Sequence, residues 1–251
     1  MIQKLKKMFV VIATFFTFLI PTFSYCQQVY DHSINNTVFE RSEYYTKNQT
    51  HKSYDSFLTE VNTSTKIFVH FAGCGGITPA DHKTKSHYFL FDGAVIFINF
   101  LKRPGVKSSC PGGKFADTSE VSNINRLDLR RKEAEVLVLD LKSKGYNNIY
   151  VSGHSEGGRV ASTWTMPVKG VIIHGCDCKL HWFWNIQRNQ KTIVMFNWKD
   201  DWLTAKREVA SCQHFFNRGW VTEVNTNEVS HIPFSNALFV EEFQKWLINT
   251  L

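Results

Sequence analysis

The amino-acid sequence predicts an α/β fold with a mostly parallel central sheet and helices on both faces. Continuous apolar runs, such as residues 94–100, are typical of parallel strands that are buried on both faces. Helical patterns alternate with these runs, which implies a sheet wound with right-handed crossovers. Because ligands of such sheets bind at the carboxyl ends of the strands, candidate site residues are expected there.

The chain has 251 residues, enough for one large domain with a substantial core. We expect this domain to cover residues 64–251, after a signal peptide at 1–26 and an N-terminal polar segment at 27–63. The polar segment has no clean periodicity and indicates one or two edge strands at most. The strands expected in the domain are residues 66–71, 94–100, 149–151, 168–174, 192–196 and 220–224. The helices expected are residues 127–144, a helix that follows residues 153–158 and ends before Pro167, and residues 235–248.

The first 26 residues have the features of a secretory signal peptide. Three lysines precede an apolar stretch from Met8 to Ile20, Pro21 ends it, and small residues allow cleavage before Gln27. We therefore expect a secreted or periplasmic protein with no stable membrane span after cleavage. The alternatives are an uncleaved N-terminal anchor, or a lipoprotein at Cys26, which the bulky Tyr25 disfavours.

Charge gives little indication of a nucleic-acid partner. The formal net charge of +7 falls to +4 when the three lysines of the signal peptide are removed. The remaining basic residues are spread out, as in Lys102-Arg103 and Arg130-Arg131-Lys132. We interpret them as solvated surface charge and expect no nucleic-acid binding.

The residues that organise the site are Gly153-His154-Ser155-Glu156-Gly157-Gly158. They follow an apolar strand and precede a helical stretch, which is the context of a G-x-S-x-G nucleophile elbow. Such a turn needs glycines because the serine backbone is strained and neighbouring chain packs close to it. The pattern predicts that Ser155 is a catalytic nucleophile exposed above the strand ends.

A serine nucleophile needs a general base, and the base needs an acid that orients it. In the expected chain order the acid follows residues 192–196, where Asp200 and Asp201 stand, and we favour Asp200. Asp201 would then point elsewhere and cap the next turn. The base should follow the last strand, and His231 does so. Other histidines are interpreted as structural or as out of order: His32, His51, His70, His82, His87 and His154.

Backbone N–H groups are also needed to hold the oxyanion of a tetrahedral intermediate. One donor should be the N–H of Glu156, directly after the nucleophile. The other should come from the glycine-rich loop Gly73–Gly76, where the N–H of Cys74 is the expected donor. The side chain of Glu156 has a plainer alternative role, which is to hydrogen-bond nearby backbone.

Four motifs together resemble the dienelactone hydrolase-like family of α/β-hydrolases, in a variant with a serine nucleophile. Ala72-Gly73-Cys74-Gly75-Gly76 is similar to the family's H-G-C-G-G loop, and G-H-S-E-G-G to its elbow. Residues 99–105 followed by Cys110 resemble D-S-F-x-x-R-G…C, and residues 200–204 resemble D-D-W-T. The resemblance covers residues 64–248 and implies an α/β-hydrolase fold with a Ser/Cys-Asp-His site acting on esters or lactones, without metal or cofactor. Ala72 and Asn99 depart from the family's histidine and aspartate, which weakens any claim to the dienelactone substrate itself.

The resemblance and the expected export together imply disulfides among the five cysteines left after signal cleavage. Cys74 is expected to pair with Cys110, and either Cys176 or Cys178 with Cys212. The odd number leaves one cysteine over. The alternative is a metal site, which is disfavoured because Cys-x-Cys is tighter than usual zinc spacing; its ligands would be His174, Cys176, Cys178 and His181.

The leading hypothesis is therefore an exported serine hydrolase that cleaves a small-molecule ester or lactone through an acyl-enzyme. Two alternatives stay open: an acyltransferase or peptidase with the same triad, and a catalytically silent hydrolase-like binding protein. The oligomeric state is left open as well. Aromatic residues near the expected site either line an apolar pocket or pack in the core or a cap: Trp182, Phe183, Trp184, Trp198 and Trp202.

Overall fold

The computed structural model describes residues 38–103, 106, 120–176, 178, 190–204, 211–212 and 220–250, with side chains of the long helix given from Arg126 on. The strands are β1 Ser42–Tyr45, β2 Thr50–His51, β3 Lys66–Phe71, β4 Gly93–Ile98, β5 Ile149–His154, β6 Gly170–His174, β7 Thr192–Asn197 and β8 Val221–Thr226. The helices are α3 Tyr54–Glu60, α4 Pro79–Phe89, α5 Glu120–Ser143, α6 Glu156–Ser162, α7 Asp201–Thr204 and α9 Ala237–Ile248, with short 3-10 turns η2 Phe100–Lys102 and η5 Pro233–Ser235.

The described strands form one sheet of eight, in the order β2-β1-β4-β3-β5-β6-β7-β8. From β4 to β8 every neighbouring pair is parallel, and only β1 and β2 at one edge run antiparallel. This confirms the predicted α/β fold class. The polar segment for which one or two edge strands were expected supplies β1 and β2, and the compact unit that contains them begins at Val38.

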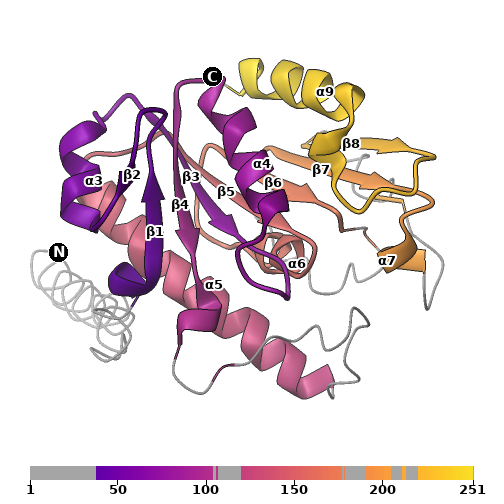
Figure 1. Cartoon of the computed structure of the whole chain (residues 1–251), viewed down its shortest axis with the longest axis horizontal. Helices are drawn as coiled ribbons and strands as arrows, with labels where there is room; N and C mark the ends of the chain where they lie inside the picture. The colour runs from indigo at the N-terminus through magenta and orange to yellow at the C-terminus, as the bar shows by residue number, and fades with distance from the viewer. Residues whose placement is uncertain are drawn as a thin grey trace, which may run out of the picture. The chain divides into compact units, whose positions relative to one another are not determined.

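Helices cover both faces of the sheet (Figure 1). Alternate side chains of the parallel strands enter two separate cores, because successive residues of a strand point to opposite faces. One core joins Val69 and Ile173 to residues of α3, α5 and α6. The other joins Phe68 and Ile172 to residues of α4 and α9. Both faces of the central strands are therefore buried away from solvent, which explains their continuous apolar sequence.

Helices α3 and α4 were not indicated by the apolar pattern, and the segment of α4 reads only as polar. Its buried side chains are Asp81, Thr84 and Tyr88, so no apolar stripe marks the buried face. The helix begins instead with a capping box, in which Asp81 accepts hydrogen bonds from the backbone N–H and the hydroxyl of Thr78. Among the described helices, none is long and apolar enough to cross a membrane.

Candidate active site

Ser155 sits on a sharp turn between β5 and α6 and adopts φ 55° and ψ −116°, a backbone conformation that side-chain-bearing residues rarely take. The flanking glycines make this turn sterically feasible. A Cβ on Gly153 would lie 2.0 Å from the carbonyl oxygen of Gly157, and a Cβ on Gly157 would lie 2.0 Å from that of Phe71. The predicted strand, strained serine and helix are therefore all present at the carboxyl end of β5, but the expectation that Ser155 is exposed is wrong, because only 6% of it is.

The glycine-rich loop after β3 runs directly beside Ser155. A Cβ on Gly73 would lie 3.5 Å from the Ser155 Cβ, and the loop turns back through a hydrogen bond from the N–H of Gly76 to the carbonyl of Gly73. Cys74 lies between them and is disulfide-bonded. Its expected partner, Cys110, lies outside the described residues. This loop thus brings backbone N–H groups close to the serine.

Asp200 and His231 lie on the loops after β7 and β8 and are hydrogen-bonded to each other. The distance from His231 Nδ1 to Asp200 Oδ2 is 2.6 Å, and Asp200 is fully buried. The second carboxylate oxygen of Asp200 accepts the N–H of Leu203 in the first turn of α7. The expectation that Asp201 caps this turn is wrong, because Asp200 caps it while Asp201 is the exposed first residue of the helix.

Asn197, the last residue of β7, joins the acid loop to the base loop. Its side-chain amide donates to the carbonyl of Ser230, directly before His231, and its amide oxygen accepts the hydroxyl of Thr226. Asn197 is fully buried, so these bonds are shielded from water. Sequence reasoning missed this positioning role, since nothing at the sequence level distinguishes Asn197 from an ordinary strand end.

His154, the residue before the serine, also contacts the base loop. Its Nε2 donates to the backbone carbonyl of His231 at 3.0 Å. Gly175 leaves room for this contact, because a Cβ there would lie 2.9 Å from the same carbonyl oxygen. Burial, together with the charge of His231, lowers the pKa of His154 to about 4. A neutral His154 therefore links the serine turn to the loop that carries the base.

A row of imidazoles continues from His154 toward α4. The ring centroids of His154 and His174 are 5.1 Å apart, and those of His174 and His70 are 5.5 Å apart. Nε2 of His70 is hydrogen-bonded to Asp81 and its Nδ1 to the hydroxyl of Ser152, each at 3.0 Å. Burial acts to raise the pKa of Asp81, but the hydrogen bond and charge of His70 outweigh it and lower the pKa to about 2. His70 and His154 thus make the kind of internal contacts expected of structural histidines.

His174 stands in the middle of this row and is fully buried. Burial lowers its pKa well below the ordinary value, so the ring is neutral. Neither ring nitrogen has a hydrogen-bond partner among the described residues. Its carbonyl oxygen accepts the N–H of Ser155 at 2.9 Å, which ties β6 to the serine turn.

The side chain of Glu156 makes ion pairs with Arg126 and Arg130, rather than only the nearby backbone bonds that were considered for it. The interpretation of Arg130 as solvated surface charge is wrong, because only 2% of this residue is exposed. Its burial against the serine turn and the glycine-rich loop was not predictable from a charge run.

The disulfide among the later cysteines joins Cys178 to Cys212, one of the two pairings considered. Cys176 is buried and outside this bond. The alternative metal site loses a thiolate to the disulfide, and another of its ligands, His181, lies outside the described residues. No cluster of three or more metal-ligating side chains occurs in the part of the chain that the structure describes.

Of the aromatic residues considered for a pocket, Trp198 can be placed. It packs against the core and its indole N–H donates to Asn225 at 2.8 Å. The side chains of Trp182, Phe183, Trp184 and Trp202 lie outside the described residues. The core interpretation therefore applies to Trp198.

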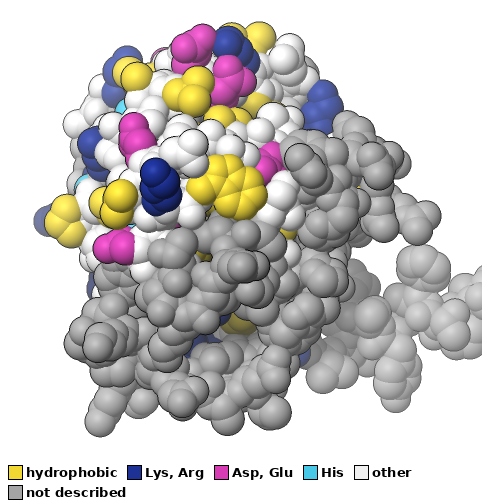
Figure 2. All heavy atoms as spheres, turned by 90° about the vertical axis from the view of Figure 1, so that its right-hand side faces the viewer, with side chains coloured by type: hydrophobic (Ala, Val, Ile, Leu, Met, Phe, Trp, Pro, Cys, Tyr) yellow, Lys and Arg dark blue, Asp and Glu magenta, His cyan; other side chains and the backbone are white. Residues whose placement is uncertain are grey.

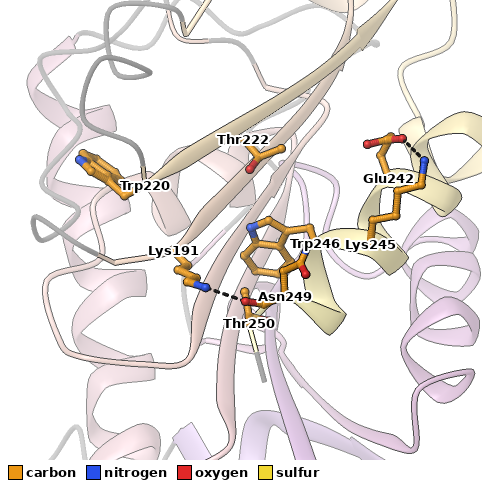
Figure 3. A pocket seen from close by; sticks show the side chains of 8 residues that line it. All are labelled: Lys191, Trp220, Thr222, Glu242, Lys245, Trp246, Asn249 and Thr250. Carbon is orange, nitrogen blue, oxygen red and sulfur yellow. Dashed lines mark hydrogen bonds and ion pairs between the residues drawn. The ribbon is translucent and has the colours of Figure 1, made fainter.

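A hollow of about 360 Å³ lies at the opposite edge of the sheet (Figure 3). Lys191 and Trp220 stand directly before β7 and β8, so this hollow is at the amino ends of the strands. Lys191 donates to the backbone carbonyl of Asn249 there. Figure 2 shows the side of the molecule on which β8 lies, where cationic and anionic side chains are interspersed on the described surface. The candidate catalytic residues are at the other ends of the strands.

No protein-family model matches the chain, and no curated protein does. Est1E from Butyrivibrio proteoclasticus with ferulic acid bound superposes with a TM-score of 0.52 at 11% identity, over 83% of this chain and 95% of that one. A bifunctional GH43-CE protein of Bacteroides eggerthii gives a TM-score of 0.49 at 15% identity. The match covers 83% of this chain but only 36% of the length of that protein. XC6422 from Xanthomonas campestris, a member of the α/β serine hydrolases without lid, gives 0.48 at 12% identity over 75% of this chain and 84% of its own.

At such low identity the match to Est1E shows the fold alone. This chain has an α/β-hydrolase fold. The finer resemblance to the dienelactone hydrolase-like family stays a prediction.

Proposed function

We propose that this protein is an exported serine hydrolase that cleaves a carboxylic ester or lactone through an acyl-enzyme. The observation that carries the proposal is the hydrogen bond between the buried Asp200 and the partly buried His231, at the same edge of the sheet as Ser155 on its strained turn. The three residues also occur in the chain order of an α/β-hydrolase triad. The fold itself is compatible with many chemistries, so the site rather than the fold supports the reaction.

In the proposed reaction Ser155 Oγ attacks the acyl carbonyl and its proton passes to Nε2 of His231. The Nδ1–H of His231 donates to Asp200, which leaves Nε2 as the acceptor and stabilises the imidazolium that forms. The tetrahedral oxyanion receives hydrogen bonds from the N–H groups of Cys74 and Glu156. When the intermediate collapses, His231 returns the proton to the leaving alcohol. Water then attacks the acyl carbonyl as His231 takes its proton, and collapse of the second tetrahedral intermediate releases the acid and returns the proton to Ser155 Oγ.

Every catalytic group in these steps belongs to the chain, and the only co-reactant is water, so the proposal includes no metal and no cofactor. The substrate is proposed as a small-molecule ester or lactone. Est1E was solved with ferulic acid, which makes a feruloyl ester one useful compound to test here. A simple aryl acetate and a lactone represent the other substrate classes.

Export is the second part of the proposal. The Cys178–Cys212 disulfide supports it, because such bonds persist in oxidising compartments. Residues 1–26 are proposed as the cleaved signal, and residues 64–251 as the catalytic domain after an N-terminal polar segment. Mass spectrometry of the exported protein should find an N-terminus at Gln27. Recovery of the intact N-terminus in the membrane fraction would support the anchor alternative instead.

The reaction is tested with a panel of acyl esters and lactones, with and without added amine or alcohol acceptors. Hydrolysis by the wild type, reduced at least about a thousandfold in Ser155→Ala, is the expected result. Preferential transfer of the acyl group to an acceptor would replace the hydrolase assignment by an acyltransferase. Equal rates for the wild type and Ser155→Ala would contradict the proposed nucleophile.

A further inference from the structure

Four arginines and two buried glutamates form ion pairs around helix α5, which contributes Arg126, Arg130 and Glu133. Glu133 contacts Arg41 and Arg103, and Glu156 contacts Arg126 and Arg130. Each carboxylate therefore receives two guanidinium groups. The group around Glu156 differs from the other in its place, because it lies between the serine turn and the glycine-rich loop.

The guanidinium of Arg130 bonds to both of these segments at once. One terminal nitrogen lies 2.7 Å from Glu156 Oε1, and the other lies 2.5 Å from the carbonyl oxygen of Ala72. Ala72 begins the loop that contains Cys74, and Glu156 directly follows the nucleophile. The two segments that Arg130 joins are thus the ones that supply the two proposed oxyanion donors.

The packing around Arg130 leaves little freedom for these contacts. Arg126 holds the second oxygen of Glu156 at 2.6 Å, and the ring of Phe100 lies against the Arg130 guanidinium, 5.4 Å from centroid to Cζ. A small cavity of about 10 Å³ is lined by Cys74, Arg130 and Glu156 among others. The distance between the two donor segments is therefore set by a rigid planar group rather than by a flexible contact.

Stability alone is a weak reason for such an arrangement. Buried ion pairs are often no more stabilising than apolar residues of similar volume, because the charges lose their hydration. Catalysis gives a stronger reason, since oxyanion donors must be held in place before the reaction begins. A planar guanidinium with two defined donor directions can hold a carbonyl and a carboxylate at a fixed separation.

We propose that Arg130 is a positioning residue that sets the spacing of the oxyanion hole by clamping the Ala72 carbonyl to the Glu156 side chain. This inference rests on the proposed function. Arg130 does not touch the reacting atoms; it acts through the N–H groups of Cys74 and Glu156. Its loss should weaken transition-state binding and leave ground-state binding nearly unchanged.

The test compares Arg130→Met and Arg130→Lys with the wild type in kcat, KM and inhibition by an arylboronic acid that forms a tetrahedral adduct. Arg130→Met should lower kcat about a hundredfold, within the range known for one oxyanion donor, with KM changed by less than about threefold. Boronate inhibition should weaken by a similar factor. Arg130→Lys, which can still donate to one segment, should recover at least about tenfold of the lost kcat.

Arg41→Met is the matched control, because it removes a buried arginine from Glu133 without touching the glycine-rich loop. Its kcat should stay within about threefold of the wild type once the folded fraction is taken into account. If Arg130→Met does not fold, the double variant Arg130→Met/Glu156→Met removes both charges and keeps the backbone N–H of residue 156. The same loss of kcat and boronate affinity is expected of the double variant.

The inference by itself is overturned by a folded Arg130→Met or double variant with kcat near that of the wild type, or by an equal loss of kcat in Arg41→Met. A rise in KM alone would also contradict it, since that would indicate a substrate contact. A wild type that turns over no ester and binds no boronate would instead overturn the proposed function, and the inference with it.

Discussion

Replacing Asp200 with asparagine changes a single oxygen of the proposed acid, and the structure determines which way the new amide points. Oδ1 of Asp200 accepts the N–H of Leu203, so the amide oxygen of the asparagine is held in that position. The amide nitrogen must then face Nδ1 of His231, where Oδ2 now lies at 2.6 Å. An N–H donor at this place makes Nδ1 an acceptor and puts the ring proton on Nε2. His231 then presents a donor to Ser155 and cannot accept its proton.

The wrong tautomer should lower kcat about 10⁴-fold, as in triads where the corresponding change has been made. This factor corresponds to about 5 kcal/mol of transition-state stabilisation. The fold should be retained, because the asparagine keeps the cap of α7 and has nearly the same volume. The assay is kcat and KM for an aryl acetate, with circular dichroism to show that the variant is folded.

Asp201→Asn is the matched control, because Asp201 is exposed at the first position of α7. Its kcat should stay within about twofold of the wild type. A loss of less than tenfold in folded Asp200→Asn would refute the argument. So would a larger loss in Asp201→Asn, which would reverse the assignment of the acid.

Three further predictions concern the residues around the triad. His154→Met removes the hydrogen bond to the base loop and should lower kcat by roughly tenfold to a hundredfold, whereas His154→Gln, which can still donate, should be less affected; equal kcat in both variants and the wild type would exclude this positioning role. Below pH 6.5, His154 binds a proton in the unfolded state but stays neutral in the folded protein. The free energy of unfolding should therefore fall by roughly 3 kcal/mol as the pH drops from above 6.5 to 4. His174 adds in the same direction, and urea denaturation of His174→Leu should show a flatter pH dependence than the wild type; identical slopes would contradict this. Replacing both Cys178 and Cys212 with alanine should lower the free energy of unfolding by about 3–4 kcal/mol, and a loss below about 1 kcal/mol in chemical denaturation would show that the disulfide contributes little.

Much of the sheet was predictable because its strands are buried on both faces. The apolar runs indicated β3, β6, β7 and β8 to within two residues at each end. The expected strand at residues 94–100 ends instead at Ile98, because a 3-10 turn begins at Phe100. Strand direction followed from the alternation with helices, and it placed the loops after the strands at one edge.

Helix α4 was missed for a physical reason. Its inward face carries Asp81 and Thr84, whose burial is compensated by hydrogen bonds to His70 and to the backbone. His70 belongs to another element, and the partner of Thr84 is the carbonyl of Ala80 within the helix, so no apolar pattern in the sequence signals the burial of this face. Helix periodicity indicates a buried face only where that face is apolar.

The candidate triad could be anticipated because each member follows a different strand in a fixed chain order. The side chains that position the triad and the neighbouring loops could not be anticipated. Arg130 bonds to residues 26 and 58 positions away in the chain, and Asn197 to a residue 33 positions away. Such contacts depend on the register of whole elements, which a single sequence does not encode in any short pattern. For this reason the run Arg130-Arg131-Lys132 wrongly indicated that Arg130 is exposed to solvent.

A fluorophosphonate probe tests whether Ser155 is a nucleophile activated by its surroundings. The measurement is covalent labelling of the purified, folded protein, with the modified residue located by peptide mass spectrometry. We predict one probe per chain, on Ser155, with labelling abolished in Ser155→Ala and slowed strongly in Asp200→Asn. Labelling at another residue, or no labelling of the folded wild type, would show that Ser155 is not an activated nucleophile.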